Sequence, residues 1–531
     1  MKKYLIFEDR KLRNILLLFL IIFLFILTND FGISYDEFWY RDNGFIVLSF
    51  IGEIFAPEKI LEIKNTKDLQ YPSIQEILSR APIGFKIQHT VYSAIEFIFF
   101  EGAEKKVVFL MRHYLNILMS SLLFITCYKI FRLKFDKYIS LIGFSLIVLS
   151  PKMFPDFYYN PNDIWAFFAA SLTSYCTLYF LKTNKIKYIY ILSFLFAFAI
   201  NTRLIFFYLY FLFILFFFIK NNFNLHKENL IKLFKQFILF IFILFLLTPQ
   251  MWIDYFGIIN LFIQQLSFPE NPMILFNGEF QRTYELSWYF TFFWIFASTP
   301  ILYLLFLFIG FLSYIKLFFD NNKFSKKELT DNFFLLYLLI PIVALIVFKP
   351  NLYNGWRHFY FLNLGFAYFC LLGIKFFFTK IKSKKLFITF NILIFLNFFN
   401  IILWMYKNHP YQNVFFNVLF KNVSEKYEMD YWGLSNTEAL GFIIEDSKYH
   451  KGNVSIKAIG ENRIIYAYKL LDNNIKNKIK ILKRDSLTNA DYYITTFGDG
   501  KNKDYYISSG YSILNEIKVD NFPINLVLKK R

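Results

Sequence analysis

Hydrophobic runs of about 17 residues or more recur along the first three quarters of the chain, and short polar segments separate them. Since a helix needs about 20 apolar residues to cross a bilayer, these runs predict membrane-spanning helices. The first extends from Leu12 to Thr28, one of the later ones from Leu286 to Tyr314, and the last ends near Met405. We expect a polytopic α-helical membrane protein with about 11 to 13 transmembrane helices, 11 fitting the charge pattern best.

Basic residues gather in alternate connections between these runs. An excess of Lys and Arg marks cytoplasmic loops, so the opposite connections should lie outside the cytoplasm. The stretch from Gly84 to Phe100 contains Lys86 and Glu96, and it preserves this alternation only as an amphipathic helix at the membrane surface. The segments predicted to be inside hold three to five Lys or Arg each: residues 1–13, 129–137, 182–187, 220–235, 316–327 and 375–385.

After Tyr406 the chain has ordinary charge density and alternating, strand-like runs at 454–459, 491–495 and 524–528. A helical stretch precedes them, from Thr437 to Lys448. Alternation with a period of two is typical of half-buried strands. We therefore expect a transmembrane module over 1–406, with an outer loop at 29–106 and its interfacial helix near 84–100, followed by a small α/β domain over 407–531 on the outer face.

Composition supports the membrane class and excludes others. The 531 residues are 56% hydrophobic, and the formal net charge is +19. Because the basic residues lie between the apolar runs, they indicate topology, and we expect no nucleic-acid partner. Cys127, Cys176 and Cys370 lie inside apolar runs, without the spacing of a metal site or a disulfide framework.

The outer connections hold the residues that could perform chemistry. Asp36 and Glu37 directly follow the first helix, where a carboxylate is costly unless it faces water, a cation or another partner. The inner connections hold mostly Lys, so the asymmetry predicts a functional site on the outer face. The other outer residues of this kind are Asp156, Asp163, Arg203, Asp254, Arg357 and His358.

Three of these residues also have structural interpretations. Asp163 follows Asn160-Pro161 at a helix start, where it fits an N-cap, a cation ligand or a partner for a sugar hydroxyl. Arg357 is suited to clamping a phosphate, or to anchoring a helix at the interface beside Trp356. Arg203 lies between two apolar runs and needs an acidic residue or a lipid phosphate.

The position of the Asp36–Glu37 pair, the amphipathic helix in the same loop and the acidic second outer loop resemble GT-C membrane glycosyltransferases. More narrowly, three motifs are similar to those of bacterial relatives of protein O-mannosyltransferases and lipid A aminoarabinose transferases. They are Ser150-Pro151 with Asn160-Pro161-Asn162-Asp163, Tyr353-Asn354-Gly355-Trp356-Arg357-His358, and Asp430-Tyr431-Trp432-Gly433-Leu434-Ser435. One departure is Asn162, which stands where many relatives have Lys; Lys152 or Lys86 would then take over a phosphate-binding role.

The resemblance implies a glycosyltransferase of the bacterial cytoplasmic membrane, with its active site and C-terminal domain outside the cytoplasm. The implied partners are a polyprenyl-phosphate-sugar donor, membrane lipids, and an acceptor that is a protein, a lipid or an envelope glycan. An inverting transfer needs a base for the acceptor hydroxyl and a way to stabilise the leaving phosphate. We expect Asp36 to be the base and Glu37 to orient it or bind the acceptor. The expected phosphate ligands come from Lys86, Lys152, Arg203, Arg357 and His358.

Two alternatives stay open. No cofactor is established, but paired carboxylates suit hard cations, so Asp36 with Asp156 or Asp163 could hold Mg²⁺ or Mn²⁺. The chain could instead be a transporter or flippase of lipid-linked sugars, with ion-coupling carboxylates. Against transport, the later helices show no acidic residue well inside the predicted spans. A non-catalytic scaffold would leave the polar outer cluster unexplained.

Overall fold

The computed structural model describes most of the chain. Asp254 and Asn354, which the sequence places in the outer connections, lie outside the described residues, as do residues 58–85 of the predicted first outer loop. The described residues are 10–57, 86–223, 226–253, 256, 259, 263, 272–321, 329–353, 355–420, 423, 426–448, 453–458, 461–482, 490–497 and 501–531.

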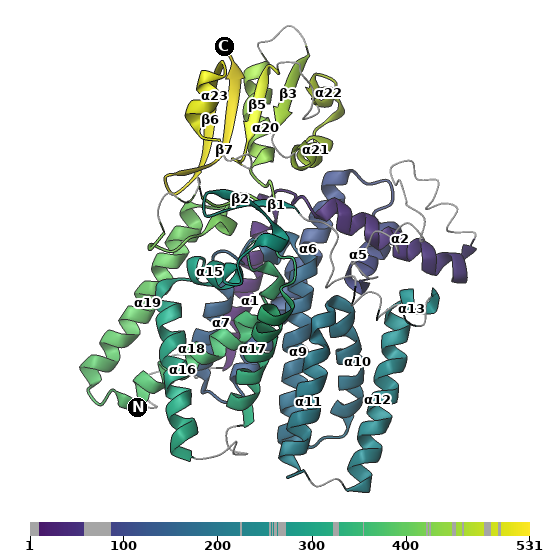
Figure 1. Cartoon of the computed structure of the whole chain (residues 1–531), viewed down its shortest axis with the longest axis vertical. Helices are drawn as coiled ribbons and strands as arrows, with labels where there is room; N and C mark the ends of the chain where they lie inside the picture. Colours follow the sequence, from purple (N-terminus) through teal and green to yellow (C-terminus); the bar gives the residue numbers. More distant parts are fainter. Residues whose placement is uncertain are drawn as a thin grey trace.

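Apolar helices form a bundle, and a small β-sheet lies at one end of it (Figure 1). Among the described residues, seven helices are long and apolar enough to cross a membrane: α6 (Lys105–Phe131), α9 (Pro161–Thr183), α12 (Lys227–Leu247), α16 (Ile301–Asn321), α17 (Leu329–Phe348), α18 (Leu362–Lys380) and α19 (Lys384–Lys407). Four shorter apolar helices accompany them: α1 (Arg10–Ile26), α7 (Lys137–Val148), α10 (Lys187–Thr202) and α11 (Phe207–Lys220). In chain order these helices match the predicted spans, so the predicted fold class is confirmed.

The predicted span from Leu286 to Tyr314 is wrong as a single helix. The structure divides it into α15 (Phe290–Ala297) and α16, with Pro300 directly before the start of α16. Proline has no backbone N–H and its ring conflicts with the carbonyl one turn earlier, so a helix does not continue through it unperturbed. The break lets Ser298 accept a hydrogen bond from the Trp356 indole, 2.9 Å away, on the segment that carries Arg357.

In its described residues, the predicted first outer loop contains a further helix besides the expected one. α5 (Ile87–Phe99) lies within the expected interfacial helix, but α2 (Glu37–Phe55) occupies residues predicted to be loop. The two helices pack so closely that a Cβ added at Gly44 of α2 would collide with the His89 carbonyl. Only glycine, which has no Cβ, fits at this position. Figure 1 shows α2 and α5 at the end of the bundle that carries the sheet.

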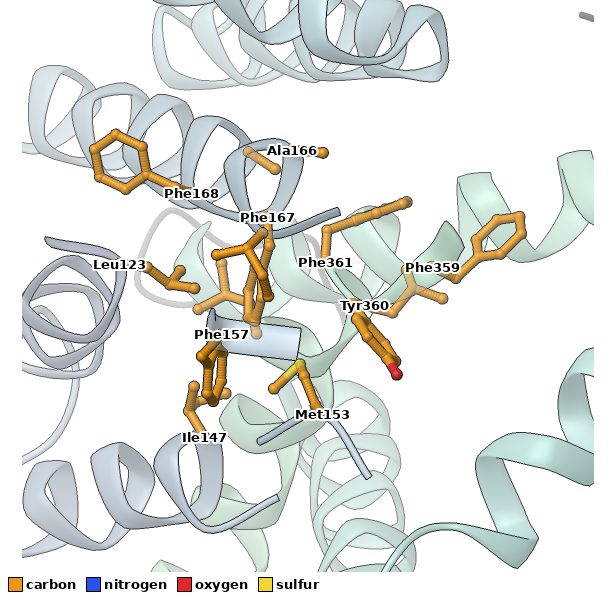
Figure 2. Packing of buried hydrophobic residues seen from close by; sticks show 14 of the residues in the cluster. Leu123, Ile147, Met153, Phe157, Ala166, Phe167, Phe168, Phe359, Tyr360 and Phe361 are labelled. Atoms are coloured by element: carbon orange, nitrogen blue, oxygen red, sulfur yellow. The ribbon is translucent and has the colours of Figure 1, made fainter. Parts of the chain in front are cut away.

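The site-bearing connections rest on a buried aromatic core. Figure 2 shows Phe157 of α8 (Asp156–Tyr159) and Phe167 of α9 in the same buried cluster. Tyr360, beside the short helix η6 (Arg357–Phe359), closes the same cluster and donates a hydrogen bond to Asp156 over 3.2 Å. This core therefore fixes the Asp156 and Arg357 segments relative to each other.

The C-terminal region contains a mixed five-stranded sheet in the order β4-β3-β5-β7-β6. β3 is parallel to β4 and β5, whereas β7 is antiparallel to β5 and β6. The predicted strands correspond to β3, β5 and part of β7, and the predicted helix corresponds to α20. The predicted domain boundary between residues 406 and 407 stays a prediction. The elements are α20 (Asn436–Ser447), β3 (Val454–Ala458), α21 (Glu461–Lys469), α22 (Asn473–Lys476), β4 (Ile479–Ile481), β5 (Tyr492–Thr495), α23 (Lys503–Ser508), β6 (Tyr511–Val519) and β7 (Phe522–Lys530).

A second, two-stranded sheet lies between α12 and α15 in the sequence. β1 (Met273–Phe276) and β2 (Glu279–Arg282) form an antiparallel hairpin through Asn277-Gly278, both at positive φ. Asn-Gly is the preferred pair for such a turn. α13 (Gln250–Ile253) precedes this hairpin.

Candidate active site

Asp36 leads into α2 and is more accessible than the nearby carboxylates of Glu37 and Asp163. Its side chain is 16% exposed, against 4% for Glu37 and 1% for Asp163. Its Oδ2 accepts a hydrogen bond from the Tyr40 hydroxyl at 3.1 Å and lies 3.2 Å from Nη1 of Arg357. Of the three, Asp36 therefore offers the carboxylate most open to a ligand.

Glu37 is buried and both of its carboxylate oxygens are engaged. Oε2 accepts the backbone N–H of Ser34 at 2.6 Å, and Oε1 lies 2.6 Å from Nε2 of His113 on α6. These contacts fix the turn that carries Asp36 against a membrane helix. The geometry suits an orienting role better than contact with an acceptor, and either role stays a prediction.

The start of α9 organises the second acidic loop. Asn160 is the N-cap and accepts the backbone N–H of Asp163 at 3.1 Å, so Asp163 lies in the first turn. The Asn160 amide donates to Asp156 at 2.7 Å and to Asp163 at 2.8 Å. Burial raises the pKa of Asp156 to about 6, although Asn160 and Arg357 favour its charged form.

Arg357 connects the carboxylates to the C-terminal region. Nη1 lies 3.2 Å from Asp36 and 3.6 Å from Asp163, while the guanidinium carbon lies 4.7 Å from the centre of the Trp432 ring. Tyr353 and Tyr431 flank it at 4.9 and 5.7 Å. Burial disfavours its charge, but Asp36 raises the pKa of Arg357 well above its usual value. Within the described residues, its Nε has no hydrogen-bond acceptor, and its Nη1 meets Asp36 and Asp163 at ion-pair distance without hydrogen-bond geometry, so the buried guanidinium can take a further anion.

Lys86 and Arg203 complete a cationic cluster with Arg357. Arg203 pairs with Asp163, and Nζ of Lys86 donates to the Asn162 side chain at 2.6 Å. Burial, and then Arg203 and Arg357, hold the pKa of Lys86 well below its usual value. Burial and Arg357 lower the pKa of Arg203 to about 10. An anionic ligand would relieve this repulsion.

His358 lies beside these cations, whereas the Lys152 ammonium has other partners. Burial, Arg357, Arg203 and Lys86 together push the pKa of His358 well below its usual value, so its imidazole is neutral near pH 7. The Lys152 ammonium donates to the Asn413 carbonyl at 2.9 Å and lies 4.7 Å from the centre of the Trp294 ring. Of the two lysines predicted as substitutes at Asn162, the structure brings Lys86 there.

Several residues at the site were not predicted. Arg112 and His113 lie in the apolar run of α6, and ionisable residues inside a span are a signal of function that could have identified them. Arg112 and Arg41 both bind Glu96, at 2.7 and 2.6 Å. Tyr431 and Trp432 belong to one of the three sequence motifs, but the sequence predicts no role for these aromatic residues.

The described residues do not fit the divalent-cation hypothesis well. Asp36 and Asp163 share a guanidinium group, and no group of three His, Cys, Asp or Glu in the described part of the chain could hold a metal ion. We derive no chemical step through a metal, and the metal site stays a hypothesis.

Comparisons with known proteins agree with this architecture. Residues 104–252 match a family model described as dolichyl-phosphate-mannose-protein mannosyltransferase. The fold is similar to the apo crystal structure of the Archaeoglobus fulgidus oligosaccharyltransferase, with a TM-score of 0.51 and 11% identity over 89% of this chain and 64% of that one. The chain thus spans about two thirds of that protein's length.

A second similar structure is the oligosaccharyltransferase AglB from Archaeoglobus fulgidus in complex with an inhibitory peptide and a dolichol-phosphate. Its TM-score is 0.49, with 11% identity over 93% of this chain and 71% of that one. No curated protein matches the chain in sequence.

Proposed function

We propose that the chain is a GT-C membrane glycosyltransferase that moves a sugar from a polyprenyl-phosphate-linked donor to an acceptor outside the cytoplasm, as the family match over residues 104–252 and the similar fold support. The observation that carries this proposal is a partly exposed carboxylate, Asp36, beside the buried cations Arg357, Arg203 and Lys86. The donor class is supported by the family that matches residues 104–252, whose description names dolichyl-phosphate-mannose.

The donor phosphate would bind at the cationic cluster. Arg357 has an unfilled donor, its Nε. The positive charges of Lys86, Arg203 and Arg357 repel one another, and an anion bound among them would reduce this repulsion. A phosphate that engages Arg357 competes with Asp36 for the guanidinium group. Donor binding would then free an Asp36 oxygen for the acceptor hydroxyl.

Asp36 would act as the general base. It takes the proton of the acceptor hydroxyl while that oxygen bonds to the anomeric carbon of the sugar. The bond from this carbon to the phosphate oxygen breaks, and its electron pair leaves on polyprenyl phosphate. Arg357, Arg203 and Lys86 stabilise the charge that develops on the phosphate. Attack opposite to the leaving group inverts the anomeric configuration, and a protein, lipid or envelope glycan could supply the hydroxyl.

Asp36→Asn tests this assignment. The purified variant should retain affinity for undecaprenyl phosphate but transfer sugar about 100-fold more slowly or worse, the usual effect of losing a general base. Transfer would be measured with undecaprenyl-phosphate-linked mannose, glucose and galactose and an extract of envelope acceptors. Asp42→Asn is the matched control, because Asp42 lies on the same helix with its side chain 50% exposed. Full turnover by Asp36→Asn would remove Asp36 from the role of base.

A further inference from the structure

Two buried polar side chains in the first turn of α5 have no partner. Gln88 is 0% exposed and His89 is 1% exposed. Within the described residues, neither the amide atoms of Gln88 nor the ring nitrogens of His89 form a hydrogen bond. Leaving one such group unsatisfied costs about 1–3 kcal/mol, so an apolar residue would serve a purely structural position better.

The His89 side chain lies next to the catalytic groups, and Gln88 precedes it in the same turn of α5. The His89 ring stacks on Tyr40, with centroids 4.7 Å apart and planes 8° apart, and the Tyr40 hydroxyl donates to Asp36. Lys86, which contributes to the cationic cluster, immediately precedes α5. The unpartnered ring of His89 is therefore close to the proposed base, and the turn that carries Gln88 and His89 begins beside Lys86 of the proposed phosphate site.

Close packing holds this turn in place. A Cβ on Gly44 of α2 would collide with the His89 carbonyl and with the Ser93 hydroxyl. The backbone N–H of Ile87 donates to the Asn201 side chain at 2.9 Å, which ties the same turn to α10. The turn cannot easily shift to give Gln88 and His89 partners from the described part of the chain.

The pair of side chains matches hydroxyl groups. Burial, Lys86 and Arg112 hold the pKa of His89 well below its usual value, so its ring is neutral, with one N–H donor and one acceptor. The Gln88 amide also offers donors and an acceptor. A phosphate or carboxylate can only accept, whereas a sugar hydroxyl both donates and accepts.

We infer that Gln88 and His89 bind hydroxyl groups of the donor sugar and so select which sugar is transferred. This inference rests on the proposed function, in which the sugar lies between the base and the phosphate. It assigns the phosphate to the cations and sugar recognition to α5.

Gln88→Met and His89→Phe test the inference, because each keeps the approximate shape and Phe keeps the stacking on Tyr40. The measurement is affinity, by thermal shift, for undecaprenyl phosphate and for the same lipid carrying mannose, glucose or galactose. Wild type should prefer at least one sugar-bearing lipid by about tenfold, equivalent to 1.4 kcal/mol. Each variant should lose most of that preference, keep its affinity for undecaprenyl phosphate, and melt no lower than wild type. Thr90→Val is the control on the same helix, because the Thr90 hydroxyl already donates to the Lys86 carbonyl.

The outcomes separate the inference from the proposed function. If wild type prefers a sugar-bearing lipid and both variants keep that preference, the inference is wrong while the proposed function stands. Variants that melt lower and bind undecaprenyl phosphate poorly would show a structural role and also overturn the inference. If wild type neither prefers nor turns over any of these donors, the proposed function fails and the inference fails with it.

Discussion

Arg357 is the residue on which the site geometry depends most. It lies within ion-pair distance of Asp36 and Asp163 and on the face of the Trp432 ring. A guanidinium group can make these contacts together because it is planar and carries several donors, whereas an ammonium is a point charge. Charge alone therefore does not explain an arginine here.

We expect Arg357→Lys to lower kcat/KM for sugar transfer by about 10- to 100-fold, because the loss of one charge-assisted contact costs about 1.5–3 kcal/mol. Steady-state transfer from an undecaprenyl-phosphate-linked sugar measures the effect. Arg282→Lys is the matched control, since Arg282 is exposed on β2. Equal rates for Arg357→Lys and wild type would contradict the role assigned to the guanidinium group.

Asp156 should make stability depend on pH in an unusual direction. Burial raises its pKa to about 6, above the value in an unfolded chain, so the folded protein holds this proton more tightly. Its contribution to stability is full below about pH 4 and is lost as the pH rises to about 6, a change on the order of 3 kcal/mol. The apparent unfolding midpoint of wild type should fall between pH 4 and 6 for this reason. The midpoint of Asp156→Asn should not show this part of the fall. Parallel curves for the two proteins would contradict the assignment.

At the residue scale, the sequence predicted which charged groups come together better than how they pair. Asp36, Asp163, Arg203 and Arg357 were predicted from their place in outer connections, and the structure brings them together. Their partners depend on side chains from distant helices, such as His113 with Glu37, which no local pattern contains. The same limit left the choice between Lys86 and Lys152 open.

The close approach of α16 and α18 illustrates the element scale. A Cβ on Gly310 would collide with the Phe369 carbonyl, and one on Gly373 with the Phe306 carbonyl. Small residues let membrane helices approach in this way, where packing rather than the hydrophobic effect holds them together.

Gly310→Leu should therefore destabilise the protein by about 1–3 kcal/mol or more, through overpacking. Thermal unfolding in detergent would measure this as a lower midpoint. Gly441→Ala is the control, because no heavy atom lies within 4 Å of a Cβ added at Gly441 on α20, and a helical alanine is about 0.5–1 kcal/mol better than glycine. An unchanged midpoint for Gly310→Leu would show that the helices can separate at little cost.

Helix prediction succeeded where hydropathy is sufficient and failed where packing decides. α2 was missed because its first turns carry Glu37, Arg41 and Asp42, and its helical form depends on packing against α5. The β1–β2 hairpin was missed although Asn277-Gly278 is a strong turn signal, since its flanking strands have only four residues each.

At the scale of the whole molecule, the C-terminal region forms part of the site. The Trp432 carbonyl accepts the backbone N–H of Tyr35 at 3.0 Å, next to Asp36, while its ring lies against Arg357. Asp520, between β6 and β7, accepts from the Trp404 indole of α19 at 2.8 Å. The sheet is thus tied both to the site and to the helical bundle, and catalysis should require the full chain.

In the proposed function, this protein transfers a sugar from a lipid phosphate and does not merely move the lipid across a membrane. The most direct test is turnover in proteoliposomes loaded with an undecaprenyl-phosphate-linked sugar and supplied with acceptor. We predict that undecaprenyl phosphate and glycosylated acceptor form in equal amounts, with the anomeric configuration inverted, and that Asp36→Asn abolishes both. Passage of the intact lipid-linked sugar to the other leaflet, with no release of undecaprenyl phosphate, would contradict the claim.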